Sequence, residues 1–303
     1  MTPIQQVAVV GLGVMGFAFA DRLARAGYSV TGYDPDATCR ARAEGSGVWI
    51  AESAATAISR AQLILCSLPS PEALFSTAAA AIEAVEGTPF SDRPTIVELS
   101  TLDLHCKQKA HNILSPQGIH MLDCPVSGTG AQASAGEVVV YASGDSEFFE
   151  RTRPVIETFS HKALFLGQFG NGTRVKLIAN LLVAIHNVAA AEALTMAERA
   201  GIDAQRFCDI IGAGGAAGSR ILELRGSMMA KHTYLPATMR LDLWRKDLEL
   251  IEQYAAELDA ATPLFDRTLS LYGEALHRGL GAADTAAVCE VLRSMSNAAN
   301  EPN

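Results

Sequence analysis

The sequence has no surplus or cluster of positive charge. Its 24 lysine and arginine residues are scattered and are outnumbered by 33 aspartate and glutamate residues, which gives a formal net charge of −9. A nucleic-acid partner requires a basic stripe that neutralises phosphates, and a peripheral membrane anchor requires a run of basic residues. We therefore expect neither nucleic acid nor a membrane among the partners of this chain.

Cysteine and histidine are sparse and unclustered. The six cysteines include no C-x-x-C pair, and the seven histidines include no H-x-x-x-H pair. Disulfide frameworks and zinc sites depend on such spacings, so we expect reduced thiols and no metal. The first 13 residues lack a basic segment followed by an apolar one, and no apolar run reaches about 18 residues without a polar interruption. These absences predict a cytoplasmic protein without a signal peptide or a membrane span.

Glycine is arranged at a particular spacing near the N-terminus. A β-branched run at residues 5–10 leads into a G-x-G-x-x-G turn, a helical segment and a second β-branched run. In this context the pattern is typical of dinucleotide binding, and a tight turn without a ligand is the alternative. The first glycine permits the turn, the second lets the backbone approach a pyrophosphate, and the third lets the helix pack against the strand. We predict that the cofactor contacts Gly11, Leu12, Gly13, Val14, Met15 and Gly16.

An acidic residue ends the second strand of this unit. Asp34 follows Gly16 by 18 residues, where a carboxylate can accept hydrogen bonds from both ribose hydroxyls. A carboxylate at this place would repel a 2′-phosphate, so NAD is favoured over NADP. Arg40 and Arg42 lie on the next predicted helix and could weaken that preference.

Apolar runs alternate with helical segments as far as residue 167. This alternation predicts a doubly wound, mostly parallel Rossmann-type sheet, in which ligands bind at the carboxyl ends of the strands. Pro69, Thr101 and the turn at 127–130 each follow a predicted strand, and the strand before that turn is predicted over residues 118–126. Pro69 could instead simply terminate its strand, and Ser100 with Thr101 could instead cap a helix.

The chain becomes entirely helical after Gly170. We therefore predict an α/β domain at residues 1–168 and an all-α domain at residues 169–303, joined by a long interdomain helix. Residues 170–201 form that helix, with Asn171 or Thr173 as its cap and Gly201 as its end.

The interior of the long helix has few polar residues. From Leu177 to Ala191 they leave no face for water, which predicts a helix buried on all sides. Lys176 lies near its start, and Asn180 follows one turn later on the same face. A lysine here either extends its ammonium group to solvent or takes part in chemistry.

Four segments together carry a family resemblance. They are GLGVMG with Asp34, DCPVSGTGAQASAGE at 123–137, GNGTRVKLIAN at 170–180, and LDLWRKDL at 241–248. Their content and order resemble the β-hydroxyacid dehydrogenase family of the 6-phosphogluconate dehydrogenase superfamily, and the resemblance covers nearly the whole chain. That family includes 3-hydroxyisobutyrate dehydrogenases and tartronate semialdehyde reductases. The resemblance implies an NAD(P)-dependent oxidoreductase that transfers a hydride between nicotinamide and a small 3-hydroxy acid or its semialdehyde.

The resemblance also implies roles for individual residues. Lys176 and Asn180 match the catalytic pair of the family. Where the family has the second glycine of D-x-P-V-S-G-G, this chain has Thr129, whose β-branched side chain restricts the backbone and adds a hydroxyl. The implied substrate-binding residues are Ser127, Gly128, Thr129, Lys176, Asn180 and Asp247. The implied additional cofactor contacts are Leu68, Pro69, Thr101 and Lys246.

The implied mechanism places proton transfer on Lys176. Its side chain would protonate the developing alkoxide during reduction and accept the hydroxyl proton during oxidation. Burial and a neighbouring cationic nicotinamide would both lower the pKa of Lys176 toward the working pH. Ser127 and the backbone N–H groups of the 127–129 turn would bind a substrate carboxylate, with Lys246 as a counter-charge. A solvated ion pair is the alternative for Lys246 and Asp247.

Three alternative functions can be compared with the sequence, and the sequence also predicts an assembly state. Imine reductases are similar overall but usually lack a lysine at the position of Lys176. Decarboxylating 6-phosphogluconate dehydrogenases have an H-N-G-I-E-Y-type run after that lysine, which this chain does not. A non-catalytic dinucleotide-binding module would be expected to lose Lys176. The apolar long helix further predicts a homodimer or homotetramer.

Overall fold

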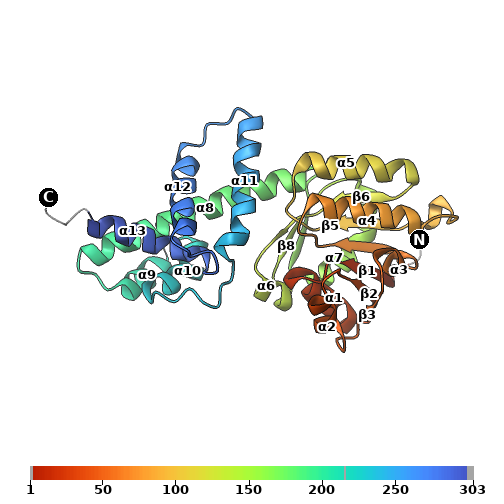
Figure 1. Cartoon of the computed structure of the whole chain (residues 1–303), viewed down its shortest axis with the longest axis horizontal. Helices are drawn as coiled ribbons and strands as arrows, with labels where there is room; N and C mark the ends of the chain where they lie inside the picture. Colours follow the sequence, from red (N-terminus) through yellow and green to blue (C-terminus); the bar gives the residue numbers. More distant parts are fainter. Residues whose placement is uncertain (1–2, 215, 299–303) are drawn as a thin grey trace. The chain divides into compact units, whose positions relative to one another are not determined.

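The computed structural model of the protein describes residues 3–214 and 216–298. The chain forms two compact units, Met1–Lys176 and Leu177–Asn303. The first unit combines a sheet with helices, and the second is helical, as Figure 1 shows.

A parallel sheet lies at the centre of the first unit, and its six strands in the described residues have the order β3-β2-β1-β4-β5-β6. The chain begins in the middle with β1, proceeds to one edge, and then returns past β1 to build the other edge. This reversal is the doubly wound arrangement that the alternation predicted. The strands are β1 (Gln6–Val10), β2 (Ser29–Tyr33), β3 (Trp49–Ile50), β4 (Leu63–Cys66), β5 (Thr95–Glu98) and β6 (His120–Asp123).

Helices cover both faces of this sheet. Val7 and Val9 belong to one apolar cluster with side chains of α1 and α7, and Ala8 and Val10 belong to another with side chains of α4 and α5. Successive strand residues point to opposite faces, so alternate residues enter the two clusters. The helices of this unit are α1 (Val14–Arg25), α2 (Ala37–Ala43), α3 (Ala54–Ile58), α4 (Pro71–Ala84), α5 (Leu104–Leu114), α6 (Gly130–Ala135) and α7 (Ser146–Phe159), with short 3-10 turns η1 (Phe90–Asp92) and η2 (Ser115–Gln117).

A second, smaller sheet follows the first. It consists of β7 (Val126–Ser127), β8 (Val139–Ala142) and β9 (Lys162–Phe165), with β7 antiparallel and β9 parallel to β8. The prediction of one strand over 118–126 was therefore wrong, because the chain leaves the large sheet at Cys124 and Pro125. Pro125 has no N–H for a ladder, and its carbonyl accepts from Tyr141 of β8 instead.

Helix α8 (Asn171–Arg199) confirms the predicted long helix. It ends before Gly201, which has a φ of +77° and allows Ile202 N–H to bond back to Ala197 O. The predicted caps Asn171 and Thr173 do not serve as such. Asn171 donates to Leu166 O, and groups outside the helix accept its first N–H bonds, as described below.

Helices α9 to α13 pack around the part of α8 that lies in the second unit. Their core contains the buried side chains of Ala184, Leu194, Trp244, Phe265 and Tyr272. The helices are α9 (Ala204–Gly212), α10 (Arg220–Ala230), α11 (Leu241–Glu257), α12 (Pro263–His277) and α13 (Val288–Ala298), with the turn η3 (Thr285–Ala287) before α13.

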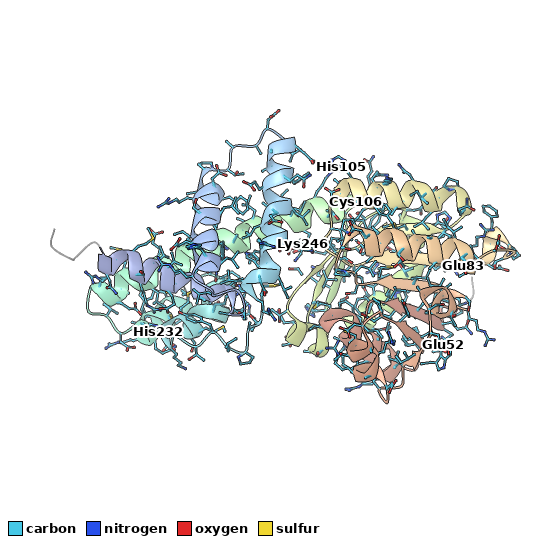
Figure 2. The ribbon with its side chains drawn as sticks, viewed as in Figure 1. Glu52, Glu83, His105, Cys106, His232 and Lys246 are labelled. Carbon is cyan, nitrogen blue, oxygen red and sulfur yellow. The ribbon has the colours of Figure 1, made fainter. Side chains whose placement is uncertain are left out.

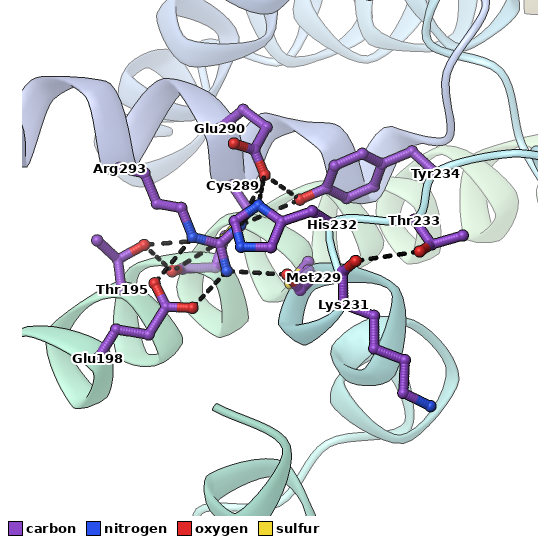
Figure 3. A network of polar contacts seen from close by, with 11 residues as sticks. Thr195, Glu198, Met229, Lys231, His232, Thr233, Tyr234, Cys289, Glu290 and Arg293 are labelled. Atoms are coloured by element: carbon purple, nitrogen blue, oxygen red, sulfur yellow. Dashed lines mark hydrogen bonds and ion pairs between the residues drawn. The ribbon is translucent and has the colours of Figure 1, made fainter. Parts of the chain in front are cut away.

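A polar network joins three segments of the helical unit (Figure 3). Arg293 of α13 binds Glu198 of α8 at 2.5 Å and Glu290 at 2.6 Å. Tyr234, from the segment between α10 and α11, donates to the same Glu290 at 2.5 Å. Burial tends to raise the pKa of Glu290, but Tyr234 and Arg293 lower it by more, so the net shift is downward. Charged and aromatic groups thus fix α13 against the end of α8.

The prediction that α8 is buried on all sides was wrong for the single chain. Leu182 is 49% exposed and Met196 is 76% exposed, and Ala189 between them is also exposed. These residues recur every seven positions and lie on one apolar stripe of the helix. In length and composition α8 could cross a bilayer. A core helix of a soluble protein meets the same criteria, so this is weak support for a membrane span.

Candidate active site

The three glycines of the N-terminal turn have different surroundings. A Cβ on Gly11, whose φ is +90°, would lie 2.1 Å from Ser67 O, and one on Gly16 would lie 1.9 Å from Gly11 O. The backbone packs too closely for side chains at both places. A Cβ on Gly13 would meet no atom within 4 Å. This open space beside the first turn of α1 fits the close approach of a pyrophosphate, whose charge the helix N-terminus favours.

The residues between these glycines differ in exposure. Leu12 is fully buried, Met15 is half-buried, and Val14 is 64% exposed. The side chain of Leu12 therefore packs in the core, so a ligand at the turn would meet the backbone of this residue.

Asp34 is held at the end of β2 by backbone groups. Its Oδ2 accepts from Leu12 N–H at 2.7 Å, and its Oδ1 accepts from Asp36 N–H at 2.8 Å. The carboxylate is thereby fixed beside the glycine-rich turn. Arg42 donates to Leu12 O and lies over the ring of Phe17, and Arg40 donates to Asp34 O at 2.7 Å. The acid and both arginines therefore surround one turn.

The loops after β4 and β5 are joined to each other. Leu68 is buried, and its N–H donates to Ser100 Oγ at 2.7 Å. Pro69 is exposed and Thr101 is half-buried. Both loops lie at the carboxyl end of the sheet, where ligands of this fold class bind. Ser100 does not cap the following helix. Asp103 is the N-cap of α5, and its side chain accepts from Cys106 N–H.

The threonine in the turn after β7 has a clear structural role. Thr129 has φ −94° and ψ 168°, an extended conformation that suits a β-branched residue. It begins α6 in a capping box, in which Gln132 N–H donates to Thr129 Oγ1 and Thr129 N–H donates to Gln132 Oε1. Ser127 is half-buried, and Gly128, at φ +146°, leaves no room for a Cβ beside Val138. The departure from glycine thus stabilises a helix start.

Lys176 lies in the second turn of α8, within the first unit. Its side chain is buried, at 8% exposure. The first turn of the helix is fixed by Asp123, whose Oδ2 accepts from Thr173 N–H at 2.8 Å. A Cβ on Gly172 would lie 2.2 Å from Tyr141 O, so this glycine lets the helix start close to the sheets.

The remaining predicted residues lie together in the helical unit. Asn180 of α8 is buried, and its Nδ2 donates to Asp247 Oδ2 at 3.0 Å. Lys246, which Figure 2 labels on α11, pairs with Asp247 Oδ1 at 3.1 Å. Lys246 is half-exposed, whereas Asp247 is buried. The alternative of a wholly solvated ion pair therefore does not describe Asp247.

Three buried charged residues escaped the sequence reasoning. Glu98, Lys107 and Asp123 have no exposed surface, and Lys107 pairs with both acids. The sequence does contain a pattern that could have identified the two acids. Glu98 and Asp123 each follow apolar residues at the end of a buried strand. Buried charges are normally paired, so such acids predict a nearby cation.

The cysteines and acids form no metal centre among the described residues. All six cysteines are free thiols. Burial raises the pKa of the Cys66 and Cys124 thiols. Cys106 lies on α5 (Figure 2), where burial and, to a lesser extent, the neighbouring Asp103 raise its pKa to about 11. These thiols are therefore protonated and weakly reactive at neutral pH.

Comparison with known families decides the identity. Residues 6–167 match the model of the NAD-binding domain of 6-phosphogluconate dehydrogenase, and residues 170–292 match the NAD-binding domain model of NADP-dependent 3-hydroxyisobutyrate dehydrogenase. The chain belongs to the β-hydroxyacid dehydrogenase family. As a β-hydroxyacid dehydrogenase it is an NAD(P)-dependent oxidoreductase of small hydroxy acids.

Individual relatives of this β-hydroxyacid dehydrogenase align over almost their whole length. L-threonate dehydrogenase of Escherichia coli K12 is 31% identical over 96% of this chain and 95% of its own. Glyoxylate/succinic semialdehyde reductase 1 of Arabidopsis thaliana is 27% identical over 95% of this chain and 98% of its own. The structure of Mycobacterium tuberculosis 3-hydroxyisobutyrate dehydrogenase with L-serine superposes with a TM-score of 0.83 at 26% identity, covering 96% of this chain and 99% of that one.

Proposed function

We propose that the chain interconverts a small carboxylate-bearing 3-hydroxy acid and its semialdehyde with Lys176 as general acid and base. The observation that carries this proposal is the burial of Lys176 near the start of α8, one turn before buried Asn180. Burying a lysine costs free energy unless its surroundings compensate for it, so such a residue is a candidate for chemistry. Lys176 would give its proton to the carbonyl oxygen in reduction and take it from the hydroxyl in oxidation.

The other residues would orient the substrate. The contact of Asn180 Nδ2 with Asp247 fixes the amide plane, so that Asn180 Oδ1 would accept from a substrate hydroxyl or an ammonium group. Ser127 and the N–H groups of Gly128 and Thr129 would bind the carboxylate. Lys246, already paired with Asp247, would supply the counter-charge.

The nicotinamide cofactor, when bound, supplies the hydride acceptor or donor. We propose that the turn from Gly11 to Gly16 holds its pyrophosphate and that Leu68, Pro69, Thr101 and Lys246 make further contacts with the cofactor. Asp34 supports NAD over NADP, because its carboxylate is fixed beside the turn and would repel a 2′-phosphate. Arg40 and Arg42 lie close enough to reduce the selectivity.

The relatives support the substrate class. Their names specify threonate, glyoxylate and succinic semialdehyde, and the superposed structure carries L-serine. These molecules share a carboxylate within a few bonds of a hydroxyl or carbonyl group. We propose that residues 1–168 bind the nucleotide and that residues 169–303 complete the substrate contacts and assemble the oligomer.

We propose a homodimer or homotetramer in the cytoplasm. The exposed stripe of α8 borders a 730 Å³ groove lined by residues of α8, α12 and α13, among them Met196, Leu264 and Met295. A second copy would cover these apolar side chains. Free thiols are consistent with a reducing compartment. Light scattering that gives 32 kDa for the particle in solution would contradict the oligomer.

The decisive experiment is turnover of Lys176→Ala with NAD(H), followed at 340 nm against a panel of small hydroxy acids and semialdehydes. We expect kcat to fall by about 10²–10⁴-fold while NADH binding, followed by fluorescence, remains. Lys162→Ala is the matched control, because Lys162 is exposed on β9. A kcat near that of the wild type in Lys176→Ala would refute the assignment. A wild-type enzyme that binds NADH but turns over neither hydroxy acids nor imines would indicate a binding module.

A further inference from the structure

Three ionised side chains meet at the carboxyl end of the large sheet without contact with solvent. Glu98 ends β5 and Asp123 ends β6, and the two residues are direct neighbours in the parallel ladder. Lys107 of α5 places Nζ 2.5 Å from Glu98 Oε2 and 2.9 Å from Asp123 Oδ1. All three side chains have 0% exposure. We call this group the strand-end triad.

Lys107 retains its positive charge over a wide range of pH. Burial alone would lower the pKa of Lys107, but Asp123 and Glu98 raise it by more, and the net shift is upward. Two carboxylates therefore share one ammonium group. The N-terminus of α8, with its partial positive charge, faces Asp123 and compensates for part of the remaining negative charge.

One arm of the triad leads to the helix that carries the proposed catalytic lysine. Asp123 accepts from Thr173 twice, at 2.8 Å from N–H and at 2.7 Å from Oγ1. Ser143 Oγ donates to Asp123 Oδ2 at 3.2 Å and accepts from Gly172 N–H at 2.9 Å. The N–H groups that a helix start leaves without partners are thereby bound to groups outside the helix. These contacts fix the rotation of α8 three residues before Lys176.

The other arm leads to the proposed cofactor loops. Lys107 donates to Ser100 O at 2.7 Å, and Glu98 Oε1 accepts from Ser100 N–H at 3.0 Å. Ser100 Oγ in turn accepts from Leu68 N–H at 2.7 Å. The carbonyl, the amide and the hydroxyl of Ser100 are all bound. The loops after β4 and β5 are thus held to each other and to the triad.

We propose that Lys107 is a positioning residue that holds the Lys176-bearing turn, through Asp123, and the cofactor loops, through Ser100, in one fixed geometry. The inference rests on the proposed function of Lys176. A fully buried ion pair contributes little net stability compared with apolar side chains of the same volume. Its benefit here is geometric, because one ammonium group bonds to the ends of both arms.

The two arms predict separable effects. Thr173→Val removes only the hydroxyl contact with Asp123, so kcat should fall about tenfold while the Kd for NADH stays within about twofold. Ser100→Ala leaves Leu68 N–H without its acceptor, so the Kd for NADH should rise about fivefold with a smaller effect on kcat. Lys107→Met should produce both changes together.

Three controls isolate geometry from folding. Thr173→Ser retains the hydroxyl and should restore kcat to within about twofold of the wild type. Lys162→Met applies the same chemical change at an exposed lysine and should alter neither constant. If Lys107→Met does not fold, the double variant Glu98→Gln/Lys107→Met keeps the net charge of the triad and leaves Asp123 as the helix cap. The double variant should still weaken NADH binding.

Amide hydrogen exchange supplies a measurement that does not depend on catalysis. Residues 172–176 should exchange faster in Thr173→Val and Lys107→Met than in Lys162→Met. Positioning is refuted if a folded Lys107 variant keeps both kcat and the Kd for NADH within about twofold, or if Thr173→Val and Thr173→Ser have equal kcat. Normal kcat in Lys176→Ala would instead refute the proposed function, while faster exchange and weaker NADH binding in Lys107→Met would still support the positioning role.

Discussion

Replacing Gly172 by alanine should displace the start of α8 by about 1 Å. The new Cβ would lie 2.2 Å from Tyr141 O, 2.7 Å from Asp123 O and 3.0 Å from Pro125 Cδ. Two of these atoms belong to the backbone of the sheets and cannot rotate away. Nonbonded contacts settle near about 3–4 Å, so the helix start must retreat from Tyr141 by about 1 Å.

This displacement has two calculable costs. Overpacking of this kind destabilises a protein by about 1–3 kcal/mol, and the better helix propensity of alanine returns at most about 1 kcal/mol. At about 2–4 °C per kcal/mol, a net loss of about 1–2 kcal/mol lowers Tm by about 2–8 °C. Lys176, the proposed catalytic group, follows Gly172 by four residues, and a shift of about 1 Å in such a group can reduce turnover by about 10²-fold.

Calorimetry and steady-state turnover below the transition measure both costs. Gly273→Ala is the matched control, because Gly273 lies inside α12 and its new Cβ would meet no atom within 4 Å. That control should gain about 0.5–1 kcal/mol and keep its kcat. The reasoning is refuted if Gly172→Ala is as stable and as active as Gly273→Ala.

Three further predictions concern charge and capping. Asp34→Ala should reduce the preference for NAD over NADP, and an unchanged ratio of the two kcat/KM values would contradict the role of the carboxylate. Thr129→Gly should cost only a few tenths of a kcal/mol and leave kcat within a few-fold, because glycine is a tolerated cap. Burial would raise the pKa of Asp284, but Thr238 and Arg225, with backbone N–H groups, lower it below its ordinary 3.8. The stability it contributes is therefore present above pH 4 and lost as pH falls further, so Asp284→Asn should flatten acid unfolding while costing about 3–5 kcal/mol at pH 7.

The glycine turn and the long helix were predictable because their signals are local. Gly16 is required by an atom five residues away and Gly11 by an atom across one strand, and the period of α8 extends over eight turns. Gly201 ends the helix by the left-handed conformation that its sequence position predicted. The break between β6 and β7 was not predicted, because the run over 118–126 is apolar enough to resemble one strand despite Pro125.

The triad and the helix cap could not be predicted from such patterns. Thr173 looks like a cap for its own helix, yet Asp123, 50 residues earlier, accepts its N–H. Such a contact depends on which strand ends below the helix, and the order of the strands is a property of the whole fold. The exposed stripe of α8 was missed for a related reason, because apolar composition predicts burial but does not specify whether the same chain provides it.

Helix α8 runs without interruption from Asn171 to Arg199 and includes both Lys176 and Asn180. A regular helix advances by a fixed step, and one inserted residue rotates everything beyond it by about 100°. The segment from Gly172 to Asn180 therefore cannot absorb insertions or deletions, since any change in length would point one of the two polar side chains to another face. Insertions and deletions during the divergence of such enzymes are expected in the connections between α9 and α10 or between α11 and α12. In these connections the spacing of residues does not fix the direction of a site side chain.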